Sequence, residues 1–333
     1  MAISIADRNR KLWEAIKKGD ISVSDLITET SGAGGGYLQR EEEDRFMQKV
    51  YASTPFLQQI RKVDMLSPRR RINKIGITGN FLHEAPSSGT ALDAAKRSKV
   101  FTQYVDMTTS ELIGSMYIPY DVLEDNLEKG MLEDTIMDAI LPPKIGRDLE
   151  KLCIQGDSTS MDSLLGTFDG VLKQLADANA NEINFNQSTG LVTDELFETM
   201  LEELPDEYRE LHDNLRYYFH WRVGDRYVMY RRQRETVEGD SIIGYDHLAQ
   251  YGFRGIPMQM TSQMPAVSGL LTPPQNIILG FQRGIQFETA RDIEARVIII
   301  VVTMRVALGI EENDACVVAD GINYSGTTTT TTG

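Results

Sequence analysis

The sequence predicts an α+β fold, and three observations support this class. Residues 131–156 have helical apolar spacing, whereas residues 69–82 and 99–119 are rich in β-branched and aromatic side chains that are typical of strands. An unbroken apolar run at 297–302 predicts a strand that is buried on both faces. With 333 residues and 41% hydrophobic content, the chain can bury a sizeable core divided over two or more domains.

The composition excludes several classes of protein. A formal net charge of −15 disfavours binding of nucleic acid, and the two cysteines are too few for a disulfide framework or a four-cysteine zinc site. The N-terminus lacks the apolar core of a signal peptide, and the longest apolar run is far shorter than the roughly 20 residues that span a bilayer. We therefore expect a reduced cytosolic protein without a membrane segment.

Residues 1–41 are predicted to form an N-terminal arm outside the core. Ile5 to Lys18 has the spacing of a short amphipathic helix. The glycine-rich run from Gly32 to Gly36 follows, and its conformational entropy would be too costly to lose inside a helix or strand. The arm is therefore expected to be tethered to the body of the protein.

The next segments predict a helix and then a long hairpin. Phe46 and Val50 have helical spacing, and a turn is expected at Pro55. Residues 67–119 are predicted as two long strands joined by a polar tip that contains Pro, Gly and Ser. Because an isolated hairpin is marginally stable in water, we expect this one to lie on another surface.

Residues 131–156 are predicted as one long helix. Its apolar side chains keep to one face, and Gly156 is expected to end it. Pro142 and Pro143 each remove a backbone donor and clash with the preceding turn, which costs about 3 kcal/mol or more for one proline inside a helix. The apolar face stays in phase across both prolines, so we expect a kink rather than two unrelated helices.

Helices and strands are mixed after residue 164. Residues 193–205 predict an amphipathic helix with Thr193 as N-cap and Pro205 at its end. Strands are expected at 217–232, where a Gly-Asp turn interrupts the segment, and at 255–265, 275–288, 292–310 and 314–322. The threonine-rich residues 323–333 are expected to be a disordered tail.

No pattern specifies a catalytic, cofactor or metal site. The histidines at 83, 212, 220 and 247 lack metal-ligand spacing, and the glycine-rich run fits neither a dinucleotide loop nor a P-loop. Cys153 and Cys316 lie in apolar patterns typical of core thiols. Arginines between 216 and 234 alternate with aromatic residues, as in some proteins that bind single strands, but acidic residues follow directly. This favours a packed strand face, and we expect no enzymatic activity.

The order of these elements resembles the major capsid proteins of tailed bacteriophages with the HK97-like fold. The similarity extends over roughly 42–322, and no single motif is diagnostic. The segments "PYDVLEDNLEKGMLEDTI" and "GRDLEKLCIQGD" resemble the spine helix of that family with its lead-in and its closing Gly-Asp. "LLGTFDGVLKQLADA" is similar to the stretch that leads into the axial domain. The uninterrupted spine helix of the family lacks the "LPPK" found here.

The resemblance implies a division of the chain into five parts. These are an arm at 1–41, a hairpin called the E-loop at 67–119, an axial domain at 164–282, a tail at 323–333, and a peripheral domain. The peripheral domain comprises 42–66, 120–163 and 283–322, with the spine helix at about 131–156. Some members of the family cross-link neighbouring subunits, but no lysine–asparagine pair here identifies that chemistry.

The resemblance also implies a function that depends on surfaces. The chain would assemble through pentamers and hexamers into an icosahedral virion shell around double-stranded DNA, without sequence-specific DNA contacts. Assembly in the cytoplasm of the bacterial host would pass through a precursor that expands. Expected partners are other copies, a separate scaffolding protein, a portal and a decoration protein. The Pro142–Pro143 kink could fix where the spine helix bends during expansion, or it could be static.

Opposite charges predict how neighbouring copies meet. The hairpin has basic residues at its base and tip, and the spine and its lead-in are acidic. Such complementarity would set register and speed encounter more than it adds affinity. The predicted intersubunit residues are Arg69, Arg70, Arg71, Lys96, Arg97 and Lys99 on the basic side, with Glu124, Asp125, Glu128, Glu133 and Asp134 on the acidic side.

Two alternative functions stay open at this point. The nearer one is the shell of an encapsulin-type nanocompartment, which resembles the same fold but packages enzymes. The more distant one is a cytosolic enzyme whose site has no recognisable pattern. Terminase and portal genes beside the gene would favour the phage shell, and a saturable small-molecule ligand on a stable monomer would favour the enzyme.

Overall fold

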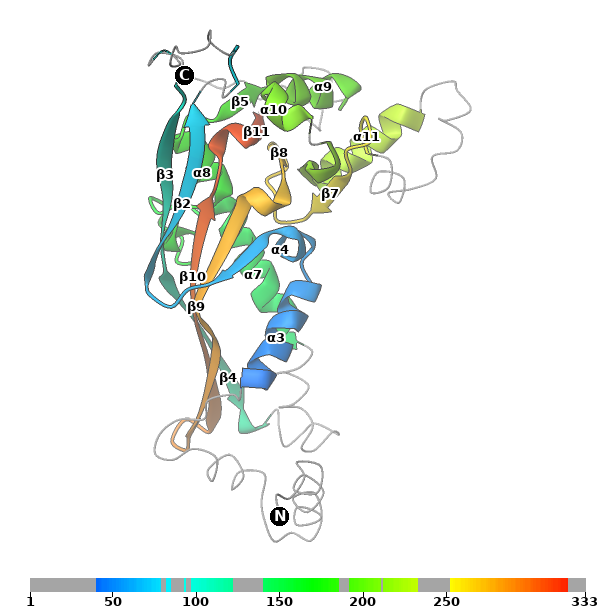
Figure 1. Ribbon diagram of the computed structural model, residues 1–333. Coiled ribbons are helices and arrows are strands. Elements are labelled where there is room, and N and C mark those ends of the chain that lie inside the picture. Colours follow the sequence, from blue (N-terminus) through cyan, green and yellow to red (C-terminus); the bar gives the residue numbers. More distant parts are fainter. Residues whose placement is uncertain are drawn as a thin grey trace, which may run out of the picture.

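The computed structural model describes residues 40–78, 82–84, 93, 97–121, 140–185, 192–210, 212–232 and 252–322, without the side chains of 40–45 and 77–78. The described chain contains two larger sheets and a separate hairpin (Figure 1). We name the sheet with strand order β1-β9-β10-β4 the long sheet, and the sheet with order β5-β11-β8-β6-β7 the short sheet. These helices and sheets confirm the predicted α+β class.

The long sheet is built on two long antiparallel strands, β9 (Ile277–Asp292) and β10 (Val297–Ile310). β1 (Arg61–Asp64) pairs in parallel with β9, and β4 (Ser110–Pro119) pairs antiparallel with β10. Helices α3 (Arg40–Ala52), α4 (Pro55–Gln59), α7 (Leu141–Gln155) and α8 (Val171–Asp177) contribute the apolar side chains that complete its core.

The short sheet has five short strands and its own aromatic core. The strands are β5 (Asn181–Asn184), β6 (Arg216–His220), β7 (Met258–Thr261), β8 (Gly269–Thr272) and β11 (Val317–Asp320). Helices α9 (Asp194–Glu203), α10 (Asp206–Arg209) and α11 (Trp221–Arg232) lie beside it. Short 3-10 turns lie at Leu165–Thr167, His212–Asn214, Pro274–Asn276 and Asn313–Ala315.

The hairpin consists of β2 (Arg69–Thr78) and β3 (Lys99–Thr108), which pair antiparallel over their whole length. Sequence analysis expected one strand over 99–119, but the structure divides this segment at Thr109. Both the amide and the hydroxyl of Thr109 donate to the carbonyl of Pro68 at the base of the hairpin. From Ser110 onward the chain belongs to the long sheet as β4.

The strand expected at 217–232 is only partly correct. Its first residues form β6, but Trp221–Arg232 is the helix α11. The buried side chains Val223, Tyr227 and Val228 follow helical spacing along one face. Gly224 lies on the same face, and a Cβ there would be 2.0 Å from the Met260 sulfur. Close packing against β7 therefore explains a glycine inside this helix.

Two strand predictions near the C-terminus also differ from the structure. The segment expected as a short strand at 275–288 is part of β9, which runs on to Asp292. The apolar run 297–302 alternates between buried and half-buried side chains, and continuous burial occurs instead at 306–310. β11 lies in the short sheet, whereas β10 before it lies in the long sheet. The predicted domain boundaries themselves stay predictions.

Helix α7 ends before Gly156, as the sequence predicts, but for a different reason. Gly156 has φ −53°, so it does not need left-handed backbone. A Cβ at this position would lie 2.3 Å from the Phe168 carbonyl oxygen and 2.9 Å from the Gly170 nitrogen. The amide of Gly170 donates to the Gly156 carbonyl at 2.9 Å. The glycine permits this close crossing of two backbone segments.

Pro142 and Pro143 lie at the start of α7 as it is described, and Ile140 before them already has right-handed helical backbone with φ −96° and ψ −46°. The predicted kink depends on residues 131–139, which lie outside the described residues, and so it stays a prediction. The arm and the threonine-rich tail also lie outside them, except for the start of α3.

Candidate assembly surfaces

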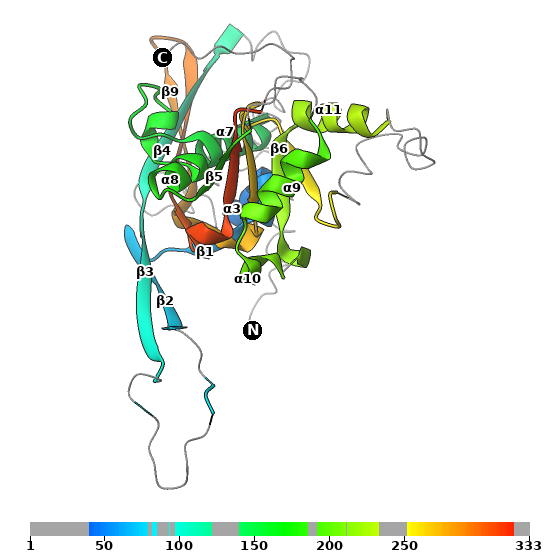
Figure 2. The same ribbon diagram turned by 90° about the horizontal axis from the view of Figure 1, so that it is seen from above.

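The hairpin β2–β3 projects from the body of the molecule, and Figure 2 shows it extending beyond the two sheets. Residues alternate between two faces along each strand. The outer face carries Ile75, Tyr104 and Val100, whose side chains are 76%, 57% and 67% exposed. Large apolar side chains in such exposed positions mark a surface that gains from being covered by a partner.

The base of the hairpin is anchored by a small separate core. Met65 and Met107 are buried together with Ile278 and Ala307 of the long sheet. Both methionines lie against glycine: a Cβ at Gly280 would be 2.5 Å from the Met65 sulfur, and a Cβ at Gly309 would be 3.0 Å from Met107 Cγ. We name this group the methionine anchor. The partly buried side chains of Val63, Ile72 and Val105 pack against this anchor and complete the apolar contact between hairpin and body.

Two of the three arginines at the hairpin base have partners within the chain, and these partners differ in kind. Arg71 forms an ion pair across the strands with Asp106 at 2.7 Å and stacks over the Tyr104 ring. Its hydrogen bonds to Asp106 raise the pKa of Arg71 and lower the pKa of Asp106. Arg70 donates to the backbone carbonyl of Asp64. Two of the predicted intersubunit residues therefore already have partners within the chain, and Arg69 lies beside them.

The other predicted contact residues are only partly described. Arg97 and Lys99 lie at the outer end of the hairpin, where β3 begins. Residues outside the described part of the chain are Lys96, Glu124, Asp125, Glu128, Glu133 and Asp134. The structure therefore does not bring the predicted basic and acidic groups together, and their pairing between copies stays a prediction.

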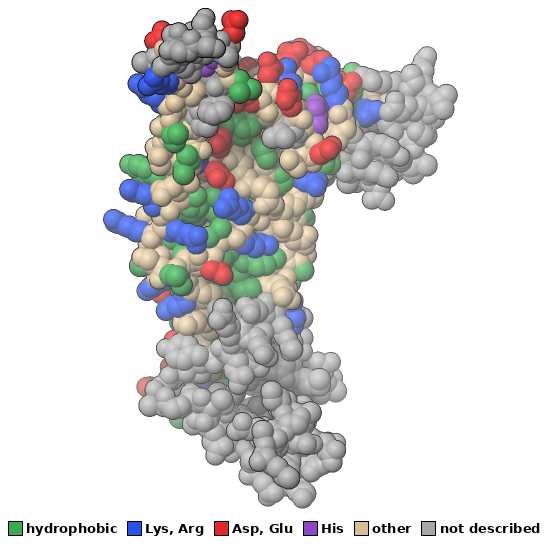
Figure 3. All heavy atoms as spheres, in the orientation of Figure 1, with side chains coloured by type: hydrophobic (Ala, Val, Ile, Leu, Met, Phe, Trp, Pro, Cys, Tyr) green, Lys and Arg blue, Asp and Glu red, His purple; other side chains and the backbone are tan. Residues whose placement is uncertain are grey.

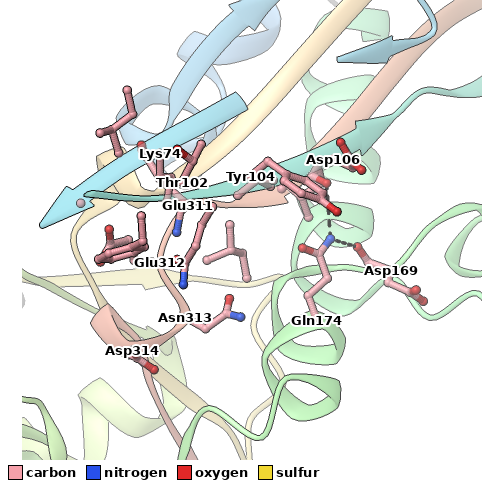
Figure 4. Close-up of a pocket in the computed structure, with 18 of the residues that line it drawn as sticks. Lys74, Thr102, Tyr104, Asp106, Asp169, Gln174, Glu311, Glu312, Asn313 and Asp314 are labelled. Atoms are coloured by element: carbon pink, nitrogen blue, oxygen red, sulfur yellow. Dashed lines mark hydrogen bonds between the residues drawn. The ribbon is translucent and has the colours of Figure 1, made fainter. Parts of the chain in front are cut away.

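A groove lies beneath the hairpin, between β2–β3 and the ends of β10 and α10 (Figure 4). Its volume is about 1140 Å³. Six carboxylates line it but only one lysine, Lys74. We name this surface the acidic groove, and its acidic residues are Asp106, Asp169, Glu207, Glu311, Glu312 and Asp314. No sequence pattern predicts this groove, because its residues come from five separate segments.

Local contacts hold the wall of the acidic groove in place. The Tyr208 hydroxyl donates to Glu312, and Glu311 forms an ion pair with Arg61 at 2.9 Å. Burial raises the pKa of Tyr208, and the hydrogen bond to Glu312 and the negative charges of Glu312, Asp314 and Glu207 raise it further. Asn276 donates to the Glu312 carbonyl at 2.7 Å and accepts from the Glu312 amide at 2.7 Å.

One buried acid connects helix α7 with helix α4 and with the short sheet. Glu150 is 2% exposed, and its carboxylate accepts from the amide of Phe56 in α4 and from Thr261 in β7. Burial raises the pKa of Glu150, and the two hydrogen bonds partly offset this effect. No sequence pattern predicts this contact, because an acidic residue in a helix is usually exposed.

Basic and acidic side chains gather on different parts of the surface. Figure 3 shows basic and apolar side chains along the edge that carries β2 and β3, and acidic side chains over α9 and α10. No group of three or more His, Cys, Asp or Glu within the described residues could hold a metal ion. Cys153 and Cys316 are buried free thiols, and burial raises the pKa of both, that of Cys316 to about 11. None of the described helices is long and apolar enough to cross a membrane.

The fold is similar to that of solved phage capsid structures. The satellite phage P4 procapsid, which includes the size determination protein Sid, matches with a TM-score of 0.57 at 15% identity, covering 84% of this chain and 98% of that chain. The Microbacterium phage Oxtober96 structure matches with a TM-score of 0.56 at 14% identity, covering 90% and 99%. The holo-SrpI encapsulin complex of Synechococcus elongatus matches with a TM-score of 0.50 at 12% identity, covering 92% and 98%.

The fold of the chain is the HK97-like fold of these capsid structures. No family model matches the sequence. Among curated proteins, the "Putative prophage capsid protein YqbE" of Bacillus subtilis (strain 168) is 29% identical over 318 residues, which is 91% of this chain and 96% of that protein. The resemblance to phage capsid proteins that the sequence predicts is confirmed by both comparisons.

Proposed function

We propose that this chain is the major subunit of a phage capsid and assembles through pentamers and hexamers into an icosahedral shell around double-stranded DNA. The hairpin is the observation that supports this most strongly. Its outer face exposes Ile75, Val100 and Tyr104, although the body behind it has two complete cores. In the shell the hairpin lies across a neighbouring copy, which covers these side chains.

The charge of the chain suits a container for DNA. A formal net charge of −15 opposes sequence-specific or tight binding to the phosphate backbone. Packaged DNA then meets a wall that repels it weakly and lets it slide. We infer contact with the genome without base readout, and a structural rather than an enzymatic role.

Further partners follow from the same proposal. The shell forms in the host cytoplasm as a precursor on a separate scaffolding protein and then expands, and a portal and a decoration protein complete it. The body divides into a peripheral part with the spine helix and an axial part, which meets its copies around the fivefold and sixfold axes. The Pro142–Pro143 segment sets where the spine helix bends, and the basic hairpin meets the acidic spine lead-in of the next copy.

Electron microscopy of the purified full-length chain tests this function, first alone and then with its candidate scaffolding protein. Closed icosahedral shells, or rings of five and six copies, are the expected result. A dispersed monomer under both conditions would overturn the proposal. Ile75→Ser is the informative variant, because it removes an exposed apolar contact without touching either core.

A second candidate is the shell of an encapsulin-type compartment, which the fold similarity to the Synechococcus elongatus encapsulin favours. The two functions differ in what the shell holds. Mass spectrometry of shells purified from the native host would identify an enzyme cargo if the compartment function holds. Recovery of nuclease-protected DNA of defined length would favour the phage capsid.

A further inference from the structure

A second pocket lies between β4, the edge strand of the long sheet, and helix α7. Its volume is about 370 Å³, within the range of about 300–1,000 Å³ that is usual for small-molecule sites. Leu112 and Met116 of β4 lie on one side of it, and Leu141 and Ile145 of α7 lie on the other. We name it the apolar pocket. It shares no lining residue with the acidic groove.

The apolar pocket exists because Gly114 has no side chain. Side chains alternate along a strand, so a side chain at position 114 would point to the same face as Leu112 and Met116. A Cβ at Gly114 would meet nothing within 4 Å, and no described side chain therefore fills the space in front of it. Glycine weakens the interior of a strand and often marks a place where a ligand or another backbone comes close.

The backbone itself does not require a glycine at this position. The described glycines with positive φ are Gly252, Gly255 and Gly321, and Gly114 is not one of them. Any residue can adopt its extended conformation, and a β-branched or large apolar residue would favour the strand. The property that distinguishes Gly114 is therefore the room that it leaves between β4 and α7.

The lining of the apolar pocket favours an uncharged ligand. The buried side chains of Ile300 and Val302 in β10 complete its apolar surface. Its charged residues within the described part of the chain are Lys144 and Asp148, which pair with each other at 2.9 Å. A charged ligand would lose its hydration without gaining a counter-charge of its own. One hydroxyl or amide group can bond to the outer edge of β4, with which no described strand pairs.

We propose that the apolar pocket binds an uncharged small molecule that is largely hydrocarbon and has at most one polar group. The bound molecule contacts α7 on one side and the long sheet on the other, so it stabilises their packing. The site belongs to the single chain and does not depend on the proposed assembly function.

Fluorescence titration of the unassembled full-length chain tests this site. The probe is phenylnaphthylamine, which is neutral, and the comparison is its sulfonated derivative, which has the same rings and one negative charge. We expect saturable binding of one phenylnaphthylamine per chain. The sulfonate should bind about tenfold more weakly or less, because its charge would be desolvated without a partner. Phenylnaphthylamine should also raise the Tm by about 2 °C at a concentration of about ten times its Kd.

Gly114→Leu is the decisive variant, because it fills the apolar pocket from β4 and its Cβ meets no neighbour. It should weaken phenylnaphthylamine binding about tenfold or more and leave the Tm of the free chain unchanged or higher. Ala290→Leu is the matched control, since it adds the same side chain at an exposed position of β9 outside the pocket. It should bind the probe like the original chain.

A second variant keeps the test decisive if Gly114→Leu does not fold. Ile145→Gln makes the α7 side of the apolar pocket polar, and it should weaken binding about fivefold or more. Thermal unfolding of each free variant shows whether it is folded before the titration is interpreted.

Several outcomes would overturn the proposal. A lack of saturable binding, or equal affinity in the original chain and in Gly114→Leu, would show that the apolar pocket is not the site. Equal affinity for the sulfonate would contradict an uncharged ligand. Binding that is present in the unassembled chain and lost in shells would show that another copy, and not a small molecule, occupies the pocket. Failure to form shells would remove the proposed function and leave this site unaffected.

Discussion

The hairpin β2–β3 and the core of the short sheet differ in where their aromatic side chains lie. Phe197 contacts the rings of Tyr217, Phe219 and Tyr227, all of which are buried. Tyr104 of the hairpin is 57% exposed and touches only the Arg71 guanidinium among described ring contacts. Aromatic and β-branched side chains therefore stabilise the folded chain in the core of the short sheet. On the hairpin they remain exposed, and in the proposed shell another copy covers them.

The largest expected effect comes from the core of the short sheet. Phe197→Ala would remove a fully buried ring from four aromatic neighbours and leave a cavity. We expect it to lower the free energy of unfolding by about 3–5 kcal/mol. Urea unfolding of the unassembled chain measures this, with Phe101→Ala on the hairpin as the matched control. Equal losses for both variants would contradict the distinction between the two regions.

A substitution at the crossing of Gly156 and Gly170 should cause the next largest loss of stability. Gly156→Ala would place a methyl group 2.3 Å from the Phe168 carbonyl oxygen, against backbone that cannot move aside easily. The expected loss is about 1–3 kcal/mol in the free energy of unfolding. Gly114→Ala is the control, since a Cβ at Gly114 meets nothing within 4 Å. A loss as large at Gly114 would refute the explanation by close approach.

Substitution of the buried acid Glu150, which connects α7 with α4 and β7, should give a smaller change in stability that depends on pH. Because burial raises the pKa of Glu150, the folded chain binds this proton more tightly than the unfolded chain. The stabilisation is complete below the unfolded pKa of about 4.3 and is lost as the pH rises through the folded pKa. Glu150→Gln mimics the protonated acid, so it should be more stable than the original chain at neutral pH.

Thermal unfolding of the unassembled chain between pH 4 and pH 8 measures this difference. The advantage of Glu150→Gln should shrink toward acidic pH, and Glu202→Gln on the exposed face of α9 should show no such trend. An advantage that stays constant across this range would show that burial does not perturb the proton affinity of Glu150.

The smallest effect on stability is expected on the hairpin itself. Ile75→Ser should change the free energy of unfolding of the unassembled chain by no more than about 0.5 kcal/mol, because the side chain is 76% exposed. Its effect should appear in the yield of shells, counted by electron microscopy beside the original chain. A loss of stability without a loss of shells would mean that the outer face of the hairpin stabilises the single chain and does not contact neighbouring copies.

Much of the architecture could be predicted from local pattern. The helices at Arg40–Ala52, Leu141–Gln155 and Asp194–Glu203 follow their apolar spacing, and β10 occupies the predicted strand. Thr193 is the N-cap of α9, as expected. In each of these elements the apolar residues keep one period from end to end. Sequence patterns are most informative in such elements.

The predictions failed where tertiary contacts override the local pattern. β3 and β4 read as one strand because nothing in "DMTTSELI" signals a change of partner at Thr109. Helix α11 is rich in residues that favour strands, and its packing beneath β7 decides the outcome. The acidic groove and the Glu150 contact were missed for a related reason. They join residues that are far apart in sequence.

The methionine anchor has a mechanical consequence. The hairpin has its own hydrogen-bond ladder, separate from that of the long sheet, and Met107, Ile72 and Val105 make its described apolar contact with the body. Met107 lies against Gly309 and Met65 against Gly280, and flexible thioether side chains can repack at low cost. A change in the tilt of the hairpin would repack these few side chains and break no ladder bond of either sheet. In the proposed shell, such a change of tilt would let one sequence meet its neighbours at the different angles found in pentamers and hexamers.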